Sequence, residues 1–257
     1  LQKSDKDDDR SLSLVGIYRH PGDLRPLTLK NADNKIVAGI CNWIIKPVVE
    51  TAACSLQNGF TGGRQFLNNV VHLDYTARRD ALLFSDHLDR AGLNFAASLS
   101  ISHIGLVNLM PVLMLFDYAA AFPSVSHAWI FVVFLKLPAG LFSLVQNLYN
   151  SNKAYFGTSE GLVFLFFVLS GVLQGCPLSG SLFVIVIDPL LLFFKKHLED
   201  TALASCRACA DDIGIALKHL HTVPDLFKWV EAYSVISGLV LKPSKCVIIL
   251  TSFISSE

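Results

Sequence analysis

Charged residues are scarce in this chain, and neither sign is in excess. They make up 16% of the 257 residues, and the formal net charge is zero. Nucleic-acid-binding domains are usually basic, so this balance argues mildly against a nucleic-acid partner, although a local groove can be positive in a neutral protein. With 52% hydrophobic residues, the chain is apolar enough to fold and long enough for one large domain or two small ones.

The chain also lacks a long uninterrupted apolar run. A membrane-spanning helix needs about 20 such residues. The longest candidates are the shorter stretches 128–135, 162–169 and 182–194, the last of which contains Asp188 and Pro189. We interpret these stretches as buried strands and helices and expect no membrane partner. Membrane association is the alternative that the mean hydropathy of +0.49 suggests.

No starting Met, signal peptide or internal repeat is visible. Residues 1–18 begin with a charged stretch and are expected to be a disordered tail, and we expect the chain to be a fragment of a longer protein. The six cysteines are scattered, which favours a reducing intracellular compartment, nuclear or cytoplasmic. Cys206 and Cys209 have zinc-like spacing but no second cysteine or histidine pair, so we favour a structural role over a zinc site.

Hydrophobic periodicity predicts a mixture of helices and strands. Helices are predicted at 31–46, which Asn31 or Asp33 would cap and Pro47 would end, and at 47–56, 68–90, 124–136, 141–150, 181–197 and 223–237. Strands are predicted at 21–29 and 113–117, around a turn at 158–161, at 202–210 and 213–217, and in a last hairpin of 239–241 with 246–250. Ser124 is expected to cap the helix that follows it.

The strongest chemical signal is a pair of adjacent carboxylates, Asp211 and Asp212, in the predicted tight turn between two strands. Aspartate is common in turns for local hydrogen bonding alone, so an ordinary turn is the alternative. A third carboxylate, Asp117, ends the predicted strand 113–117. A sheet that places Asp117 beside Asp211 would hold two divalent cations about 4 Å apart, the arrangement that polymerases use for in-line nucleotidyl transfer.

A second signal is the segment 57–64, which contains Gly59, Gly62 and Gly63. Glycines allow backbone amides to approach a phosphate or a base closely, so this segment is a candidate binding loop. The alternative is a plain connection between two helices. The charged side chains of the next helix, 68–90, are interpreted as a solvated face.

Six short motifs follow one another along residues 21–250. They are Arg-Pro-Leu-Thr-Leu at 25–29 with Asn31 and Lys35, Gln57 with Gly59-Phe60 and Gly63-Arg64, Phe116-Asp117 with Ala121-Phe122, Ser-Gly-Val-Leu-Gln-Gly-Cys-Pro-Leu-Ser at 170–179, Ala210-Asp211-Asp212, and Gly238-Leu239 with Leu241 and Lys245. In this order they resemble the fingers and palm motifs of reverse transcriptases (RNA-directed DNA polymerases) of non-LTR, LINE-type retrotransposons. The resemblance implies an α+β fold, with a partial fingers-like region at 19–110 and a right-hand palm at 111–257, an antiparallel sheet backed by helices. It shows no complete thumb.

The resemblance also implies a reaction: extension of a DNA primer with dNTPs on an RNA template by two-metal nucleotidyl transfer. Asp117 and Asp211 would ligate two Mg²⁺ ions, or Mn²⁺ in their place, and Asp212 would assist at the same metal site. Lys245 would protonate the departing pyrophosphate as a general acid, the alternative being an exposed hairpin lysine.

Further residues are implied to contact the nucleotide or the nucleic acid. Phe122, five residues after Asp117, would be a steric gate against a ribose 2′-hydroxyl, or else a core phenylalanine. Gln174 and Gly175 would lie under the incoming nucleotide and the template base. The remaining candidates are Arg25 and Lys35 for the triphosphate, and Gly63, Arg64 and Cys209 for the template or primer; each cation alone is more often a surface charge.

Four positions depart from the family pattern. Cys209 stands where an aromatic residue is usual, and Pro123, Gly180 and Lys242 also replace the usual residues. A degenerate, inactive remnant that at most binds nucleic acid is therefore the alternative function.

Overall fold

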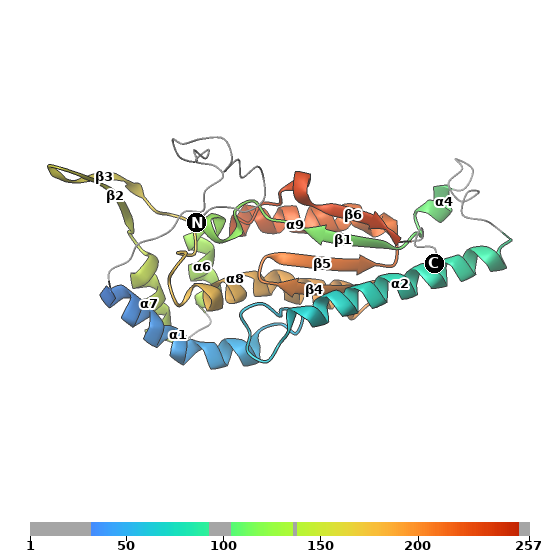
Figure 1. The fold of residues 1–257 in the computed structure, drawn as a ribbon, viewed down its shortest axis with the longest axis horizontal. Coiled ribbons are helices and arrows are strands. Elements are labelled where there is room, and N and C mark those ends of the chain that lie inside the picture. Colours follow the sequence, from blue (N-terminus) through green and yellow to red (C-terminus); the bar gives the residue numbers. More distant parts are fainter. Residues whose placement is uncertain (1–31, 93–103, 136–137, 252–257) are drawn as a thin grey trace, which may run out of the picture.

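The computed structural model describes residues 32–92, 104–135 and 138–251, and a four-stranded antiparallel sheet lies at its centre (Figure 1). Its strands run in the order β4 (Ala204–Cys209), β5 (Asp212–Leu217), β1 (Val112–Phe116) and β6 (Val247–Leu250). Helices α8 (Ser179–Phe194) and α9 (Val223–Ser237) cover one face, and α2 (Phe66–Arg90) runs along the other (Figure 1). The predicted α+β architecture is confirmed.

The alternation of β1 shows where the core lies. Val112, Met114 and Phe116 are buried among the residues of α8 and α9, whereas Leu113 packs against Leu73 and Ala77 of α2. Leu115, on the same face as Leu113, is partly exposed. Such period-two burial is what a strand with a helix-covered face requires. On the α2 side the packing is close, because a Cβ added to Gly214 of β5 would lie 2.5 Å from the Leu73 side chain.

The remaining elements surround this sheet. They are α1 (Ala32–Ala52), α4 (Ile104–Val107), α5 (Ala121–Ser124), α6 (His127–Phe134), α7 (Ala139–Tyr149), a π-helical turn Lys195–Glu199 after α8, 3₁₀ turns Leu220–Thr222 and Pro243–Lys245, and a separate hairpin of β2 (Lys153–Thr158) and β3 (Gly161–Phe167). The predicted hairpins at 158–161 and 202–217 and the helices at 68–90, 141–150 and 223–237 are confirmed within a few residues. The expectation that the apolar stretch 162–169 is buried is wrong, because β3 is exposed along its whole length.

The prediction that Pro47 ends the first helix is wrong, because α1 continues through Pro47 to Ala52. An interior proline removes one backbone donor and costs about 3 kcal/mol or more. Packing offsets this cost, since one buried stripe continues across the proline: Ala38, Cys41, Ile45 and Val49. A single helix therefore replaces the two that were predicted at 31–46 and 47–56.

The predicted helix start at Ser124 is also wrong. The Ser124 hydroxyl donates to the carbonyls of Ala119 and Ala120, both at 2.9 Å, so it closes α5 instead of capping α6. Val125 is extended, and the amide of Ser126 donates to the carbonyl of Ser237 at 2.8 Å. This long-range bond delays the start of α6 to His127.

The predicted last hairpin, 239–241 with 246–250, does not form. Instead, β6 pairs with β1 over Val112–Leu115, and Leu241 makes an isolated bridge to Tyr118. The 3₁₀ turn at Pro243 separates the two segments. The free edge of β1 offers more hydrogen-bonding groups than a three-residue partner, which explains the different pairing.

The predicted tail at 1–18, the predicted strand 21–29 with Arg25, and the candidate cap Asn31 lie outside the described residues. In the part of the chain that the structure describes, no helix is both long enough and apolar enough to span a bilayer.

Candidate active site

Register brings the first two carboxylates together. β1 and β5 are antiparallel, with Phe116 opposite Ile213. The next step along this ladder places Asp117 opposite Asp212, on the same face of the sheet. Burial raises the pKa of Asp212 above its usual 3.8, and the negative charge of Asp117 raises this pKa further. Two residues 95 positions apart in sequence are therefore electrostatically coupled, and the partner of Asp117 across the ladder is Asp212, where the sequence predicted Asp211.

The third carboxylate belongs to the turn that joins β4 to β5. Ala210 has φ +56° there, a left-handed backbone conformation that residues other than glycine rarely adopt. Asp211 follows it directly. Cys209 ends β4 beside the two acids, and its thiol pKa is raised by burial and then by the charges of Asp212 and Asp211. The structure thus places Cys209 next to the acids, and its predicted contact with a primer stays a prediction.

The donor chemistry suits a divalent cation. Mg²⁺ prefers oxygen ligands and is commonly held by one or two carboxylates together with water and substrate phosphates. Asp117 and Asp212 form such a pair. Within the described residues, however, no three His, Cys, Asp or Glu side chains are already grouped to hold a metal. The predicted three-acid cluster is therefore not preassembled.

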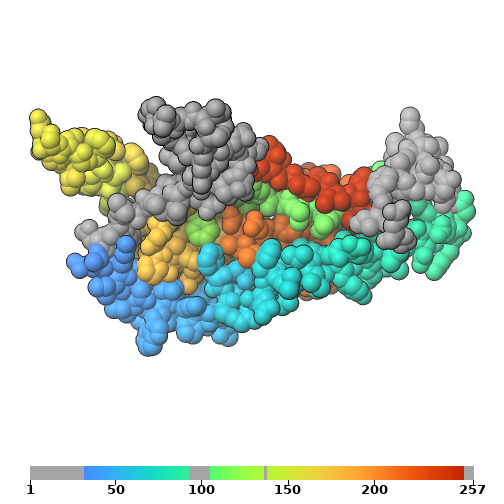
Figure 2. Space-filling model, in the orientation of Figure 1, coloured from blue at the N-terminus to red at the C-terminus, as the bar shows by residue number. Residues whose placement is uncertain are grey.

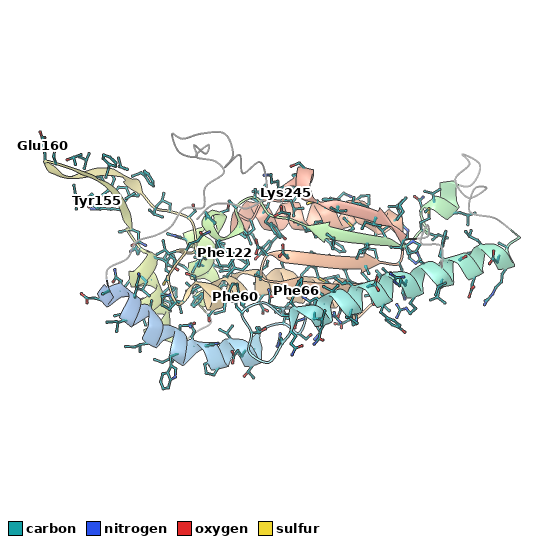
Figure 3. The ribbon with its side chains drawn as sticks, viewed as in Figure 1. Phe60, Phe66, Phe122, Tyr155, Glu160 and Lys245 are labelled. Atoms are coloured by element: carbon teal, nitrogen blue, oxygen red, sulfur yellow. The ribbon has the colours of Figure 1, made fainter. Side chains whose placement is uncertain are left out.

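Lys245 lies at the same end of the sheet. Its Nζ is 3.4 Å from Oδ2 of Asp117, and its side chain is more than half exposed on the 3₁₀ turn after α9 (Figure 3). The neighbouring Lys242 amide donates to the carbonyl of Asp117 at 2.8 Å, which fixes this turn against the end of β1. Lys245 is thus close to the acids, while its predicted proton transfer stays a prediction.

A glutamine from the loop after α1 holds the acidic turn in place. Gln57 is completely buried, and its Oε1 accepts from the amides of Ala210 at 2.8 Å and Gly59 at 2.7 Å. Its Nε2 donates to the carbonyl of Ala210 at 3.2 Å. Both backbone groups of Ala210 are therefore bound by one side chain, which positions Asp211 and Asp212 next to it.

Gly59 explains why this loop needs glycine. A Cβ at this position would lie 2.3 Å from the amide nitrogen of Ala210, closer than any real side chain approaches. The loop and the β4 strand are joined further by the Asn58 amide and the Asn69 side chain, which donate to the carbonyl of Ala208 at 2.8 and 3.0 Å. The glycine allows close contact with the acidic turn.

The other glycine-loop groups bind the protein itself, not a phosphate. The Gly62 amide donates to Oε1 of Glu50 at 2.9 Å, and the Arg64 guanidinium donates to four carbonyls at the end of α1 and in the loop. Those carbonyls belong to Glu50, Ala53, Cys54 and Gln57. The amides of Gly59 and Gly62 are therefore engaged within the protein, whereas the predicted contacts of Gly63 and Arg64 with a template or primer stay predictions. Arg64 acts here as a helix-end clamp, and Gly63 beside it has φ +74° and open space around it.

A cavity of about 750 Å³ opens beside this loop. Gln174 and Gly175 line it together with Phe122, so three of the predicted nucleotide-binding residues border the same cavity. Its other walls come from α1, the glycine loop and the start of α8, through Asn42, Lys46, Phe60, Gly180 and Ser181. The volume is within the range of small-ligand sites.

Phe122 is fixed by two other aromatic rings. It stacks on Phe183 with ring centroids 4.3 Å apart and an interplanar angle of 9°, and it meets Phe60 edge-on at 5.9 Å (Figure 3). Phe183 is fully buried, whereas Phe60 is half exposed. A Cβ on Gly180 would approach the Phe60 ring to 2.7 Å, so the glycine leaves room for this ring.

Lys35 on α1 is exposed and does not line the cavity, so its predicted contact with the triphosphate stays a prediction. Lys46, three turns later, lines the cavity and pairs with Glu50 at 3.8 Å. Lys46 and Phe183 were not among the predicted residues, and Phe60 was named only as part of the second motif. A sequence signal for Lys46 is its position four residues after Asn42, because residues with this spacing lie on the same face of a helix. Asn42 lines the same cavity.

Comparisons with known proteins agree with this geometry. A family model described as "Reverse transcriptase (RNA-dependent DNA polymerase)" matches residues 4–254. Among curated proteins, the "Transposon TX1 uncharacterized 149 kDa protein" of Xenopus laevis is 25% identical over 247 residues, which cover 91% of this chain and 17% of that protein. The chain therefore spans less than a fifth of this relative.

Solved structures with a similar fold include two telomerases. Apo telomerase from Candida Tropicalis has a TM-score of 0.52 at 13% identity, with 85% of this chain and 36% of that chain covered. Telomerase from Candida albicans, in complex with the TWJ fragment of telomeric RNA, has a TM-score of 0.51 at 10% identity, with 86% and 35% covered. At this identity the likeness concerns the fold alone, and the chain spans about a third of either structure.

Proposed function

The chain belongs to the reverse transcriptase (RNA-dependent DNA polymerase) family, and from this premise we propose that it is the polymerase domain of a non-LTR retrotransposon protein. It would extend a DNA primer with dNTPs on an RNA template. The observation that carries the proposal is the coupling of Asp117 to Asp212 beside the turn that holds Asp211. Like charges opposite each other destabilise a sheet. We infer that this cost is retained because the carboxylates form a functional site.

Reverse transcriptase domains generally use divalent metal ions, and we propose Mg²⁺, as two ions, for this chain. Asp117, Asp211 and Asp212 would hold them, with substrate phosphates and water supplying the remaining ligands. Bound divalent ions stabilise charge on the attacking and the departing oxygens of an in-line displacement. The protein contributes the positions of the carboxylates, which Gln57 fixes through Ala210.

The incoming nucleotide would occupy the cavity beside the glycine loop, whose lining includes none of the three acids. Gln174 supplies an amide that can hydrogen-bond, Gly175 permits a close approach, and Phe122 presents a ring at the same wall. Lys46 lines the same cavity and offers a cation for the phosphates. The ring of Phe122 would collide with a ribose 2′-hydroxyl and so favour deoxynucleotides.

Primer extension on an RNA template with Mg²⁺ tests this proposal. Wild-type protein should incorporate dNTPs, and Asp211→Asn and Asp117→Asn should each lose incorporation while template binding largely survives. Asp225→Asn is the matched control, because this exposed aspartate at the start of α9 pairs with Lys228 at 3.0 Å on the surface. Undiminished incorporation by Asp211→Asn would refute the metal assignment.

A second readout separates metal binding from catalysis. A ligand that binds only the folded state raises its stability, by about 2.7 kcal/mol at a hundred times its dissociation constant. Mg²⁺ should therefore raise the melting temperature of the wild type more than that of Asp117→Asn. An equal rise in both proteins would show that the ions bind elsewhere.

A degenerate domain that binds nucleic acid without catalysis is the second candidate. Two observations favour it: Lys245 already pairs with Asp117, and the described acids are not grouped as a ready metal site. Folded wild-type protein that binds a primer–template duplex but never incorporates a nucleotide would support this candidate over the polymerase.

A further inference from the structure

The β2–β3 hairpin is the one described part of the chain that extends away from the body. Figures 1 and 2 show it as a separate arm beyond α7, and Figure 3 places Glu160 at its tip. Nothing of the central sheet pairs with it, since β2 and β3 form their own two-stranded sheet. An isolated two-stranded hairpin is only marginally stable in water.

Both faces of this arm are apolar. Six consecutive side chains of β3, from Leu162 to Phe167, are between 45% and 74% exposed. In a regular strand they would alternate between the two faces, but the pairing shifts between Ala154 and Tyr155. This irregularity brings Phe164 and Phe167 into ring contact at 5.2 Å, with Tyr155 beside Phe164 at 6.0 Å.

The hairpin carries one charge of each sign, at opposite ends. Lys153 begins β2 at the base, and Glu160 lies in the turn at the tip; residues 154–159 and 161–169 contain no other Asp, Glu, Lys or Arg. Lys153 leans across to β3, because its Nζ lies 5.6 Å from the centre of the Phe167 ring. The cation therefore lies over the side chain at the base of β3.

We propose that this arm is a homodimerisation element, in which β3 pairs edge to edge with β3 of a second copy in antiparallel orientation. Antiparallel pairing places the tip of one hairpin at the base of the other. Lys153 of each copy then meets Glu160 of its partner, giving two symmetric ion pairs at the ends of a four-stranded apolar sheet. Edge strands with free backbone groups are the usual templates for such pairing.

The same residues argue against a membrane as the occupant of this surface. Anionic membrane surfaces attract clusters of basic residues, whereas the arm has no net charge. Its tip, which would enter a bilayer first, consists of Thr158, Ser159 and Glu160. A second copy satisfies both the apolar strand and the two terminal charges.

Charge exchange between copies tests this proposal on the full chain. Analytical ultracentrifugation should show a dimer for the wild type. Lys153→Glu and Glu160→Lys should each weaken it by about tenfold or more, because both ion pairs become repulsive. An equimolar mixture of these two variants should restore the dimer, since glutamates of one copy then face lysines of the other.

The mixture is decisive because neither variant alters the apolar strand. Leu165→Glu, an internal β3 change, should prevent dimerisation in every combination while primer–template binding shows that the domain is folded. A wild type that is monomeric at all concentrations, whether or not it binds anionic vesicles, would overturn the proposal. Dimers that the single variants leave unchanged, or that mixing fails to restore, would also overturn it.

Discussion

Asp117 and Asp212 face each other across the β1–β5 ladder, one step beyond the pair Phe116–Ile213. Most cross-strand pairs stabilise a sheet, but two carboxylates in this position repel each other. The pair lies where three separate segments converge: the end of β1, the β4–β5 turn and the turn that carries Lys245. The site is therefore assembled at a cost in stability, and that cost can be measured.

Replacing one member of the pair should stabilise the protein at neutral pH. Burial and the charge of Asp117 raise the pKa of Asp212 above its usual 3.8. Between that value and the raised one, the folded state binds more protons than the unfolded state, so stability falls as pH rises through this window. Asp212→Asn removes this loss. We expect this variant to melt at a higher temperature than the wild type at pH 7. Its free energy of unfolding should be larger by less than about 1 kcal/mol.

The difference in free energy of unfolding between Asp212→Asn and the wild type should shrink as the pH is lowered through 3.8. Below this pH, position 212 is neutral in both proteins. Thermal melts followed by circular dichroism at several pH values between 3.5 and 7 provide the measurement. Asp225→Asn is again the control, because its surface pair with Lys228 is more than half exposed. A stability gap that stays constant across this range would show that Asp212 is not electrostatically coupled to Asp117.

Gln57 should be required both for the position of the β4–β5 turn and for the stability of the fold. Truncation by Gln57→Ala leaves the buried amide and carbonyl of Ala210 without their partner, which costs about 1–3 kcal/mol for each group left unsatisfied. We expect a lower melting temperature and a loss of nucleotide incorporation larger than any loss of template binding. Urea unfolding and primer extension on the same preparation separate the two effects.

A pair of glycine variants sharpens this test. Gly59→Ala places a methyl group against the Ala210 backbone and should displace the turn. Gly39→Ala is the matched control, because a Cβ there meets nothing within 4 Å and alanine favours a helix interior by about 0.5–1 kcal/mol. Gly59→Ala with full incorporation activity would contradict the positioning role of this loop.

The sequence predicted the strands that carry the acids because those signals are local. Apolar runs identified β1, β4 and β5, and the short turn at 210–212 predicted the pairing of β4 with β5. The pairing of β1 with β5 is long-range, and its register places Asp212 opposite Asp117, where the sequence predicted Asp211. The role of Gln57 was not predictable, since its partner Ala210 is 153 positions away and nothing in the sequence marks that contact. The same contact explains Gly59, which lies against the backbone of Ala210.

Element boundaries failed where tertiary contacts override local preference. Pro47 is a helix breaker by its own chemistry, but the buried stripe that contains Cys41, Ile45 and Val49 keeps α1 intact across it. Ser124 has a good capping side chain, but the bond from Ser126 to Ser237 sets the start of α6. β6 pairs with β1 instead of with the segment 239–241, because the free edge of β1 can pair with the whole of β6.

Phe122 offers the test that distinguishes a substrate contact from core packing. Its ring lines the cavity on one side and stacks on Phe183 on the other, so both interpretations of the sequence have a structural basis. If the ring excludes a 2′-hydroxyl, Phe122→Val should raise the use of ribonucleotides by about tenfold or more relative to deoxynucleotides, because a smaller side chain leaves room for that group. Single-nucleotide incorporation with matched dNTP and rNTP gives the ratio directly.

Phe60→Leu serves as the control for this change. Phe60 touches Phe122 edge-on and lines the same cavity, but it comes from the glycine loop and is 52% exposed. We expect it to weaken nucleotide binding without altering the preference for the sugar. Unchanged sugar discrimination in Phe122→Val, together with a melting temperature lowered to the extent that loss of a buried ring predicts, would assign Phe122 to the core with Phe183. Discrimination lost in both variants would instead mean that the aromatic cluster as a whole shapes the cavity.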